Sequence, residues 1–391
     1  MDVNKKIHTA TFKLLEYIEK EEYKGYDPYD ALKSPLFNLP LLRTNKLIRF
    51  GAQQFEKRFP FNLRPFLFIP KGLNPVTLGL CIQAYKNLVK TFPEHSSRYE
   101  HRINKLIKNL IELIPGGYKG ACWGYDFDWE ARYANIPSYQ PTIVATGIIT
   151  NSLFNVHLAL KIPEALDLCI SSIQFILHDI KRTYEGDNFC FSYSPFDKQI
   201  VFNASMKGAR GLAQVYSITK DESLKEEAKK AVDFVMKHQD ENGAWNYSRN
   251  SAGAWVDNYH TGYVIDCLDD YIRYSGDATY RENLDKSFFY YKKHFFEEDR
   301  IPKFYNKNVY PIDCTAAGQS LLTLIRFNQL DLAQNVASWM IDNMQAKEGF
   351  FYFRKFKSRT IKTSFMRWSN AWMLLGLTEL LSTLSVGYVN N

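Results

Sequence analysis

A small residue recurs near the start of six apolar, helix-like segments, at an interval that becomes almost constant along the chain. The successive intervals are 68, 61, 54, 55 and 54 residues. The six positions are Gly79, Gly147, Gly208, Gly262, Ala317 and Ala371. A repeat of this length indicates a helical hairpin that buries its apolar side only against neighbouring copies. Six hairpins close most economically into a ring, so the pattern predicts an all-α fold, an (α/α)6 toroid, with an open solenoid as the alternative.

Two kinds of helix alternate between these positions. In residues 219–238, Leu224, Ala228 and Val235 recur at helical spacing, and the opposite side is charged. We therefore expect an outer helix there, with Thr219 and Glu222 spaced as a capping box. The segment that opens at His260 is apolar on more than one side, as expected of an inner helix.

The first 63 residues differ from the repeats. Residues 1–24 form an amphipathic pattern, and residues 26–40 are rich in proline and aromatic side chains without helical spacing. We expect residues 1–63 to form an N-terminal helix and a strap that pack on the toroid, which spans 64–391 in a single domain overall. The uncharged segment 134–160 contains polar side chains and two prolines, which favours a buried helix over a membrane span.

Composition narrows the range of partners. The net charge of +7 comes from scattered basic residues, which argues against a nucleic-acid partner. The eight histidines are isolated and no phosphate-binding glycine motif occurs, so neither a metal nor another cofactor is expected. The six cysteines have no paired spacing, and the chain starts as a charged amphipathic helix, so we expect free thiols and a cytoplasmic location.

In a toroid, the loops that precede the inner helices converge on one mouth, toward which the helix N-termini direct free N–H groups. Residues just before or at these helix starts are therefore the candidate site. The predicted catalytic residues are Asp126, Asp128, Asp257, His260 and Asp313. The predicted substrate-binding residues are Trp123, Tyr125, Trp129, Arg132, Tyr139, Tyr193, Asn203, Trp255, Asn258, Tyr305, Arg367 and Trp368.

Carboxylates, an imidazole, arginines and aromatic rings around one cavity are the groups that sugar chemistry uses. Hydrolysis requires two carboxylates roughly 5–10 Å apart, and we predict that Asp126 or Asp128 faces Asp257 or Asp313. In a lyase or an epimerase, His260 or Tyr125 would instead remove a proton beside a carboxylate that Arg132 or Arg367 neutralises.

Each of these side chains also has a structural interpretation. Asp257 would cap the helix that starts at His260, and His260 would then be a hydrogen-bonded core residue. Asp126 and Asp128 would hold Arg132 and their own loop.

Two resemblances add to this interpretation. Residues 230–245, with Gln239, Gly243 and Trp245, resemble the Gln-Trp repeat of triterpene cyclases, which are α/α toroids, although the acidic Asp-x-Asp-Asp motif of those enzymes is missing. Residues 122–129 (CWGYDFDW), 257–262 (DNYHTG) and 367–372 (RWSNAW) resemble motifs of helical-toroid proteins encoded with bacterial capsule and exopolysaccharide genes. Those proteins are similar in architecture to six-hairpin glycosidases and sugar epimerases.

The second resemblance implies a carbohydrate-active protein of bacterial surface-polysaccharide biosynthesis, either a hydrolase, a lyase or an epimerase. Its partners would be a carbohydrate, with anionic and lipid-linked glycans as candidates, and the enzymes of polysaccharide assembly. The alternatives are a non-catalytic glycan-binding or scaffolding protein and a terpenoid cyclase-like enzyme.

Overall fold

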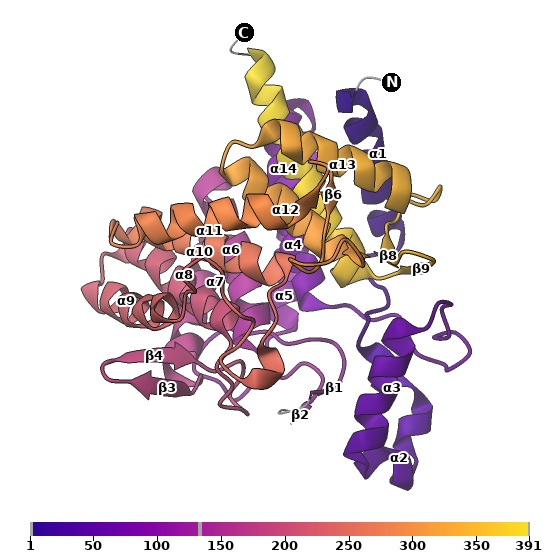
Figure 1. The fold of residues 1–391 in the computed structure, drawn as a ribbon, viewed down its shortest axis with the longest axis horizontal. Coiled ribbons are helices and arrows are strands. Elements are labelled where there is room, and N and C mark those ends of the chain that lie inside the picture. The colour runs from indigo at the N-terminus through magenta and orange to yellow at the C-terminus, as the bar shows by residue number, and fades with distance from the viewer. Residues whose placement is uncertain (1–2, 132–134, 390–391) are drawn as a thin grey trace.

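The computed structural model describes residues 3–131 and 135–389, and it forms a ring of helical hairpins (Figure 1). Each inner helix packs on the next, and the last packs back on the first, so the ring is closed. The inner helices are α4 (Pro75–Thr91), α6 (Ile143–Leu160), α8 (Phe202–Thr219), α10 (Asn258–Ser275), α12 (Cys314–Arg326) and α14 (Trp372–Val389). The predicted (α/α)6 toroid is confirmed.

Six further helices form the outer layer. Five of them follow inner helices along the chain: α5 (Ser96–Glu112), α7 (Pro163–His178), α9 (Glu222–Lys237), α11 (Arg281–His294) and α13 (Leu330–Met344). The sixth is the N-terminal helix α1 (Val3–Lys20), which packs on α13 and α14. The Gln345 amide donates to the Ala10 carbonyl at 2.9 Å and ties α1 to the end of α13. Helix α1 thus supplies the outer helix of the last hairpin.

The recurring small residues lie where inner helices approach closely. A Cβ on Gly147 would lie 2.8 Å from the Cβ of Lys207, and one on Gly79 would lie 3.0 Å from the Ile149 side chain. Both distances are shorter than side chains normally allow, so larger residues would push neighbouring helices apart. Close packing of the inner layer therefore explains the repeat seen in the sequence.

Two local expectations about helices were tested. Helix α9 begins at Glu222 and is capped by Asp221, whose carboxylate accepts from the Ser223 N–H at 3.0 Å. The predicted capping box was wrong, because Thr219 is the last residue of α8. Among the described residues, α6 is the one helix long and apolar enough to cross a membrane, and 61% of it is buried inside the toroid.

Short strands and loops cover the ends of the ring. They form three two-stranded antiparallel pairs and one three-stranded antiparallel sheet in the order β7-β8-β9. The strands are β1 (Trp129–Glu130), β2 (Asn135–Ile136), β3 (Arg182–Glu185), β4 (Asn188–Phe191), β5 (Phe296–Glu297), β6 (Ile301–Pro302), β7 (Ile312–Asp313), β8 (Tyr352–Lys355) and β9 (Thr360–Ser364).

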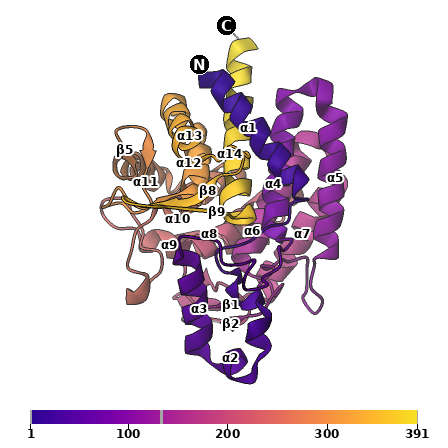
Figure 2. The same cartoon turned by 90° about the vertical axis from the view of Figure 1, so that its right-hand side faces the viewer.

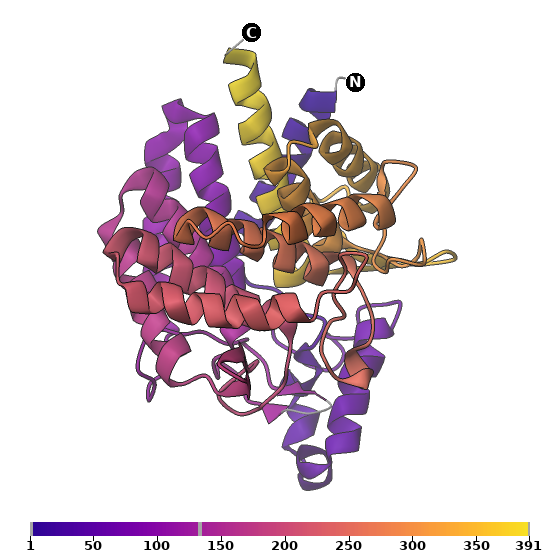
Figure 3. The ribbon, with the colours of Figure 1, turned by 60° about the vertical axis from the view of Figure 1, so that its left-hand side comes forward.

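The strap follows α1 and projects from the ring, on the side opposite both termini (Figures 2 and 3). It contains two short 3-10 helices, Asp30–Lys33 and Pro35–Asn38, and two α-helices, α2 (Pro40–Thr44) and α3 (Lys46–Arg58). Further 3-10 turns lie at Pro93–His95 and Ser251–Gly253, and a π-helical segment, Met366–Ala371, leads into α14.

Candidate active site

A cavity of about 400 Å³ opens where the inner helices begin. Its wall includes residues from the first turns of α6, α8, α10, α12 and α14, namely Val144, Asn203, His260, Thr315 and Trp372. Residues from the strap complete it, namely Tyr29, Phe50 and Gln54. The helix starts therefore converge on one mouth, and the strap lies across that mouth.

Tyrosine, phenylalanine and tryptophan are twelve of the 27 described residues that line the cavity. Tyr247 and Trp255 stack with ring centroids 4.8 Å apart and planes 9° from parallel. Tyr125 and Phe127 stack in the same way, 5.4 Å apart at 4°. The aromatic lining residues are Tyr29, Phe50, Tyr125, Phe127, Trp129, Tyr193, Tyr247, Trp255, Tyr259, Tyr263, Trp368 and Trp372. Flat apolar surfaces with hydroxyl groups at their edges suit a ligand that has both an apolar face and polar substituents.

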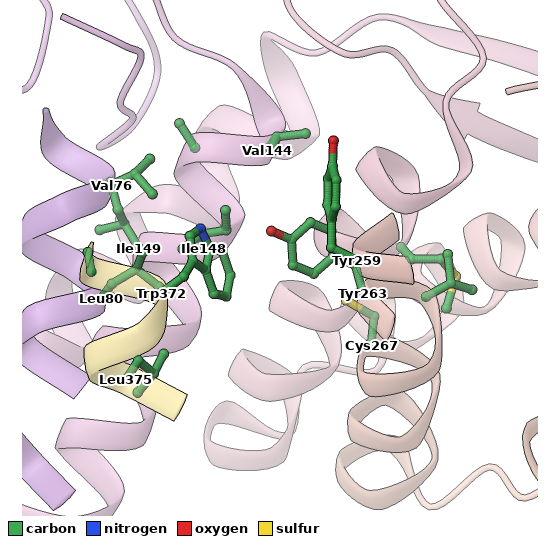
Figure 4. Packing of buried hydrophobic residues seen from close by; sticks show 14 of the residues in the cluster. Val76, Leu80, Val144, Ile148, Ile149, Tyr259, Tyr263, Cys267, Trp372 and Leu375 are labelled. Atoms are coloured by element: carbon green, nitrogen blue, oxygen red, sulfur yellow. The ribbon is translucent and has the colours of Figure 1, made fainter. Parts of the chain in front are cut away.

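Three side chains separate this cavity from a second one on the other side of the ring. Ile148, Tyr263 and Trp372 line both cavities. In Figure 4, Ile148 and Trp372 lie next to each other, and Tyr263 lies across the gap from them, beside Tyr259 on α10. Ile148, Tyr263 and Trp372 therefore form the floor of the candidate site.

His260 is the imidazole of the cavity, and Asp257 fixes its orientation. The Asp257 carboxylate lies 2.7 Å from the Nδ1 atom of His260 and accepts from the Trp255 indole at 2.9 Å. Its other oxygen accepts from the His260 backbone N–H and caps α10. Because a carboxylate faces Nδ1, that nitrogen carries the proton and Nε2 is the basic atom. Nε2 has no hydrogen-bond partner among the described residues, so it is available to a ligand in the cavity.

Arg367 is the arginine of the cavity. Its Nε and Nη2 atoms donate to the two oxygens of Asp27 at 2.7 and 2.9 Å. Its guanidinium carbon lies 4.8 Å from the centre of the Tyr125 ring. Asp27 belongs to the strap, so the strap neutralises and positions the cavity's arginine. The Nη1 atom has no hydrogen-bond partner within residues 3–131 and 135–389.

Several further polar groups reach the cavity. The side-chain nitrogens of Gln199 and Asn203 are buried without a hydrogen-bond partner in the described part of the chain. The Tyr125 and Tyr193 hydroxyls lie 3.0 Å apart, and burial raises the pKa of both above the ordinary value. Both tyrosines therefore stay protonated at neutral pH, and because one hydroxyl donates to the other, one hydroxyl hydrogen of the pair is left for a ligand. Buried donors without partners are a common feature of sites that bind a polar ligand.

Eight of the predicted site residues line this cavity: His260, Tyr125, Trp129, Tyr193, Asn203, Trp255, Arg367 and Trp368. The structure thus brings together side chains from loops that are up to 243 residues apart in the sequence. Their roles in binding or catalysis remain predictions.

The four predicted catalytic aspartates lie outside the cavity wall. Asp126 accepts from Lys33 and Asn74, and Asp128 accepts from Arg49 and is partly exposed. Asp257 and Asp313 cap α10 and α12. Asp313 also accepts from Arg354 at 2.6 Å. Among the described lining residues, Glu130 is the one acidic side chain, and it accepts from Arg49 at 3.1 Å.

Four other predicted binding residues do not line the cavity. The Trp123 indole is fully buried and donates to the Leu110 carbonyl. Asn258 donates to the Lys303 carbonyl. Tyr139 and Tyr305 lie in loops and do not line the cavity. Arg132, the remaining predicted residue, lies outside the described residues.

The sequence-based list missed two groups of lining residues. The strap residues Tyr29, Phe50 and Gln54 carry no signal that links them to loops far along the chain. Tyr263 and Trp372 directly follow Gly262 and Ala371, whereas the predicted site residues lie before or at the inner-helix starts; both side chains nevertheless line the cavity. Among the described residues, no group of three or more His, Cys, Asp and Glu side chains could share a metal ion.

Comparison with known proteins identifies the architecture. The sequence matches no protein-family model, and no curated protein is detectably similar to it in sequence. Among solved structures, the chain is similar to cellobiose 2-epimerase from Bacillus thermoamylovorans (14% identity, TM-score 0.60, covering 80% of this chain and 90% of that one). It is also similar to a glycoside hydrolase family 76 mannosidase from Bacteroides thetaiotaomicron (10% identity, TM-score 0.59, covering all of both chains). A possible member of glycoside hydrolase family 105 from Salmonella enterica is a third such structure (12% identity, TM-score 0.57, covering 79% of this chain and 83% of that one). The fold is therefore that of the six-hairpin α/α toroids.

Proposed function

We propose that this protein catalyses a proton-transfer reaction on a sugar, of the epimerase or lyase type, with His260 as the base. The observation that carries the proposal is the Asp257–His260 pair: His260 lines the aromatic cavity, and its Nε2 has no hydrogen-bond partner among the described residues. Asp257 holds the imidazole in one tautomer and stabilises the imidazolium that forms when Nε2 accepts a proton. The similar architecture of a cellobiose 2-epimerase and of glycoside hydrolases supports a sugar as the substrate.

The cavity favours proton abstraction over hydrolysis. Glycoside hydrolysis usually needs two carboxyl groups across the bond that is cleaved, and Glu130 is the one acid among the described lining residues. Proton abstraction beside a carbonyl or carboxylate needs one base and donors for the developing oxyanion. His260 would supply the base, and Arg367 and one hydroxyl of the Tyr125–Tyr193 pair would be the donors in the same cavity.

The pathway is part of the proposal. The motifs at 122–129, 257–262 and 367–372 support a role in bacterial surface-polysaccharide production, and the unpaired cysteines support a cytoplasmic location. Deletion of the gene should then reduce capsule or exopolysaccharide, and complementation with the His260→Asn variant should not restore it. Restoration by that variant would favour a scaffolding role.

The experiment that tests the reaction is hydrogen exchange with solvent. An epimerase should place deuterium from D2O on one carbon of a reducing disaccharide, whereas a lyase should convert a uronate-containing oligosaccharide to an unsaturated product. NMR follows both reactions. We expect His260→Asn to lower this exchange by about a hundredfold or more, while His294→Asn, on outer helix α11, keeps it. Unchanged exchange in His260→Asn would overturn the proposal. Sugar binding with neither exchange nor cleavage would select a glycan-binding protein, and cleavage that leaves no unsaturated sugar would select a hydrolase.

A second candidate follows from the twelve aromatic rings in the cavity wall. Such a lining also suits an isoprenoid chain, as in a terpenoid cyclase-like enzyme. Tight binding of an isoprenyl diphosphate that disaccharides do not displace would favour this alternative.

A further inference from the structure

The strap exposes apolar side chains on the outside of the molecule. Nine of the seventeen large apolar residues that are exposed in the described chain lie within residues 36–68. They are Leu36, Leu39, Leu41, Leu47, Ile48, Phe55, Phe61, Phe66 and Phe68. We call these nine residues, together with the exposed basic residues Arg43, Lys46 and Arg58, the strap face.

Helix α3 has its polar side buried and its apolar side exposed. Its buried residues are Arg49, Gln53 and Glu56, and all three are polar. Gln53 donates to the Tyr29 carbonyl at 2.7 Å and Arg49 donates to Glu130, so polar contacts fix α3 on the toroid. Leu47 is 82% exposed and Phe55 is 59% exposed on the outer side. A soluble surface helix shows the opposite arrangement, so this side of α3 lacks the apolar environment that it requires.

The charge of this region is strongly one-sided. Residues 31–93 contain one acidic residue, Glu56, which is buried and paired with Arg64. The exposed charges of the strap face are therefore all positive. Positive charge also lies next to the strap face, because Phe61 and the exposed Lys362 of β9 line one surface groove.

We propose that the strap face binds the surface of a membrane that contains anionic lipids. Apolar side chains surrounded by lysine and arginine are the pattern of segments that lie in the membrane interface, where rings and leucines enter the acyl region and the cations meet lipid phosphates. A second copy of this chain fits less well, because a symmetric contact would place two positive faces against each other.

The position of the strap gives this contact a consequence for the substrate. Phe50 and Gln54 line the cavity mouth and belong to the same helix as Leu47 and Phe55. Attachment through the strap face would place the mouth next to the lipid headgroups. If the proposed sugar reaction holds, on which this step rests, a cavity mouth beside the headgroups selects a membrane-anchored saccharide as the substrate class.

The test is binding of the purified full-length protein to vesicles, measured by co-sedimentation. One set of vesicles is phosphatidylcholine alone and the other contains about 30% phosphatidylglycerol. We expect binding to the anionic vesicles, at least about tenfold tighter than to phosphatidylcholine, and a loss of this binding when salt is raised from about 0.1 to about 0.5 M.

Matched variants make the test specific. Phe55→Glu combined with Leu47→Glu should weaken binding to anionic vesicles about tenfold or more, whereas Phe289→Glu, at a phenylalanine 67% exposed on α11, should not. His260→Asn should bind vesicles normally, which separates a failure of the membrane proposal from a failure of the proposed reaction. Equal binding to both vesicle types, or equal binding by the strap and α11 variants, would overturn the inference. A lipid-independent dimer that only the strap variant disrupts would overturn it in favour of self-association.

Discussion

The ion pair between Asp27 and Arg367 should be one of the main interactions that hold the strap on the toroid. Both side chains are at least 92% buried, and two charge-assisted hydrogen bonds of 2.7 and 2.9 Å join them across 340 residues of sequence. Removing one partner of a buried pair typically costs about 3–5 kcal/mol, because the other charge stays buried without compensation. For 391 residues, unfolding entropy near the midpoint is about 0.8 kcal/mol per degree. Asp27→Asn should therefore lower the melting temperature by about 4–6 °C.

The assay is thermal unfolding followed by circular dichroism, with Asp342→Asn as the control. Asp342 is paired with Lys6 at the surface, with 59% of its side chain exposed, so its loss should shift the melting temperature by about 1 °C or less. Replacing both partners, as in Asp27→Asn with Arg367→Met, should recover part of the loss, since no charge then stays unpaired. Equal shifts for Asp27→Asn and Asp342→Asn would show that the buried pair does not hold the strap on the toroid.

Two further predictions concern Lys207 and Asp257. Lys207 is 1% exposed, its amine has no hydrogen-bond partner among the described residues, and burial lowers its pKa to about 7. Between pH 7 and the unfolded value near 10.5 the unfolded chain binds more protons, so wild-type stability should rise with pH there. Lys207→Met should be more stable than wild type by up to about 5 kcal/mol near pH 7, as measured by urea unfolding. This gain in stability should shrink toward pH 10. A gain that does not change with pH would contradict the explanation from the buried amine. Asp257→Asn should keep α10 capped, at a cost of about 1 kcal/mol or less, yet reduce the solvent-exchange rate about 10²–10⁴-fold; a wild-type rate would exclude the orienting role of Asp257.

Much of the ring was predictable from the sequence because close helix packing requires small residues at regular positions. Positions such as Gly147 and Gly79 must be small, and they repeat with each hairpin. The convergence of the loops was predictable for the same reason, since a ring places all inner-helix starts at one mouth. His260 and Arg367 were therefore found from their place just at or before a helix start.

The part of the site that was not predictable depends on contacts between residues far apart in the sequence, which produce no pattern in the sequence around either residue. Tyr29 lines the cavity and Asp27 binds the cavity's Arg367, and both come from near the other end of the sequence. The aspartates show a second difficulty: a carboxylate before a helix suits catalysis and helix capping equally well. Asp257 and Asp313 are caps in the structure, and only the neighbouring His260 distinguishes the two positions. The exposed apolar side of α3 has a helical period like any amphipathic helix, so its inverted orientation becomes visible only when the strap is placed on the toroid.

The decisive experiment is the structure of a complex with a disaccharide that binds in solution. We expect a sugar ring in the aromatic cavity, with a carbon-bound hydrogen directed at Nε2 of His260 and a face of the ring against the lining aromatics. A sugar bound outside this cavity, or inside it with His260 directed away, would show that His260 is not the base of a sugar reaction at this site.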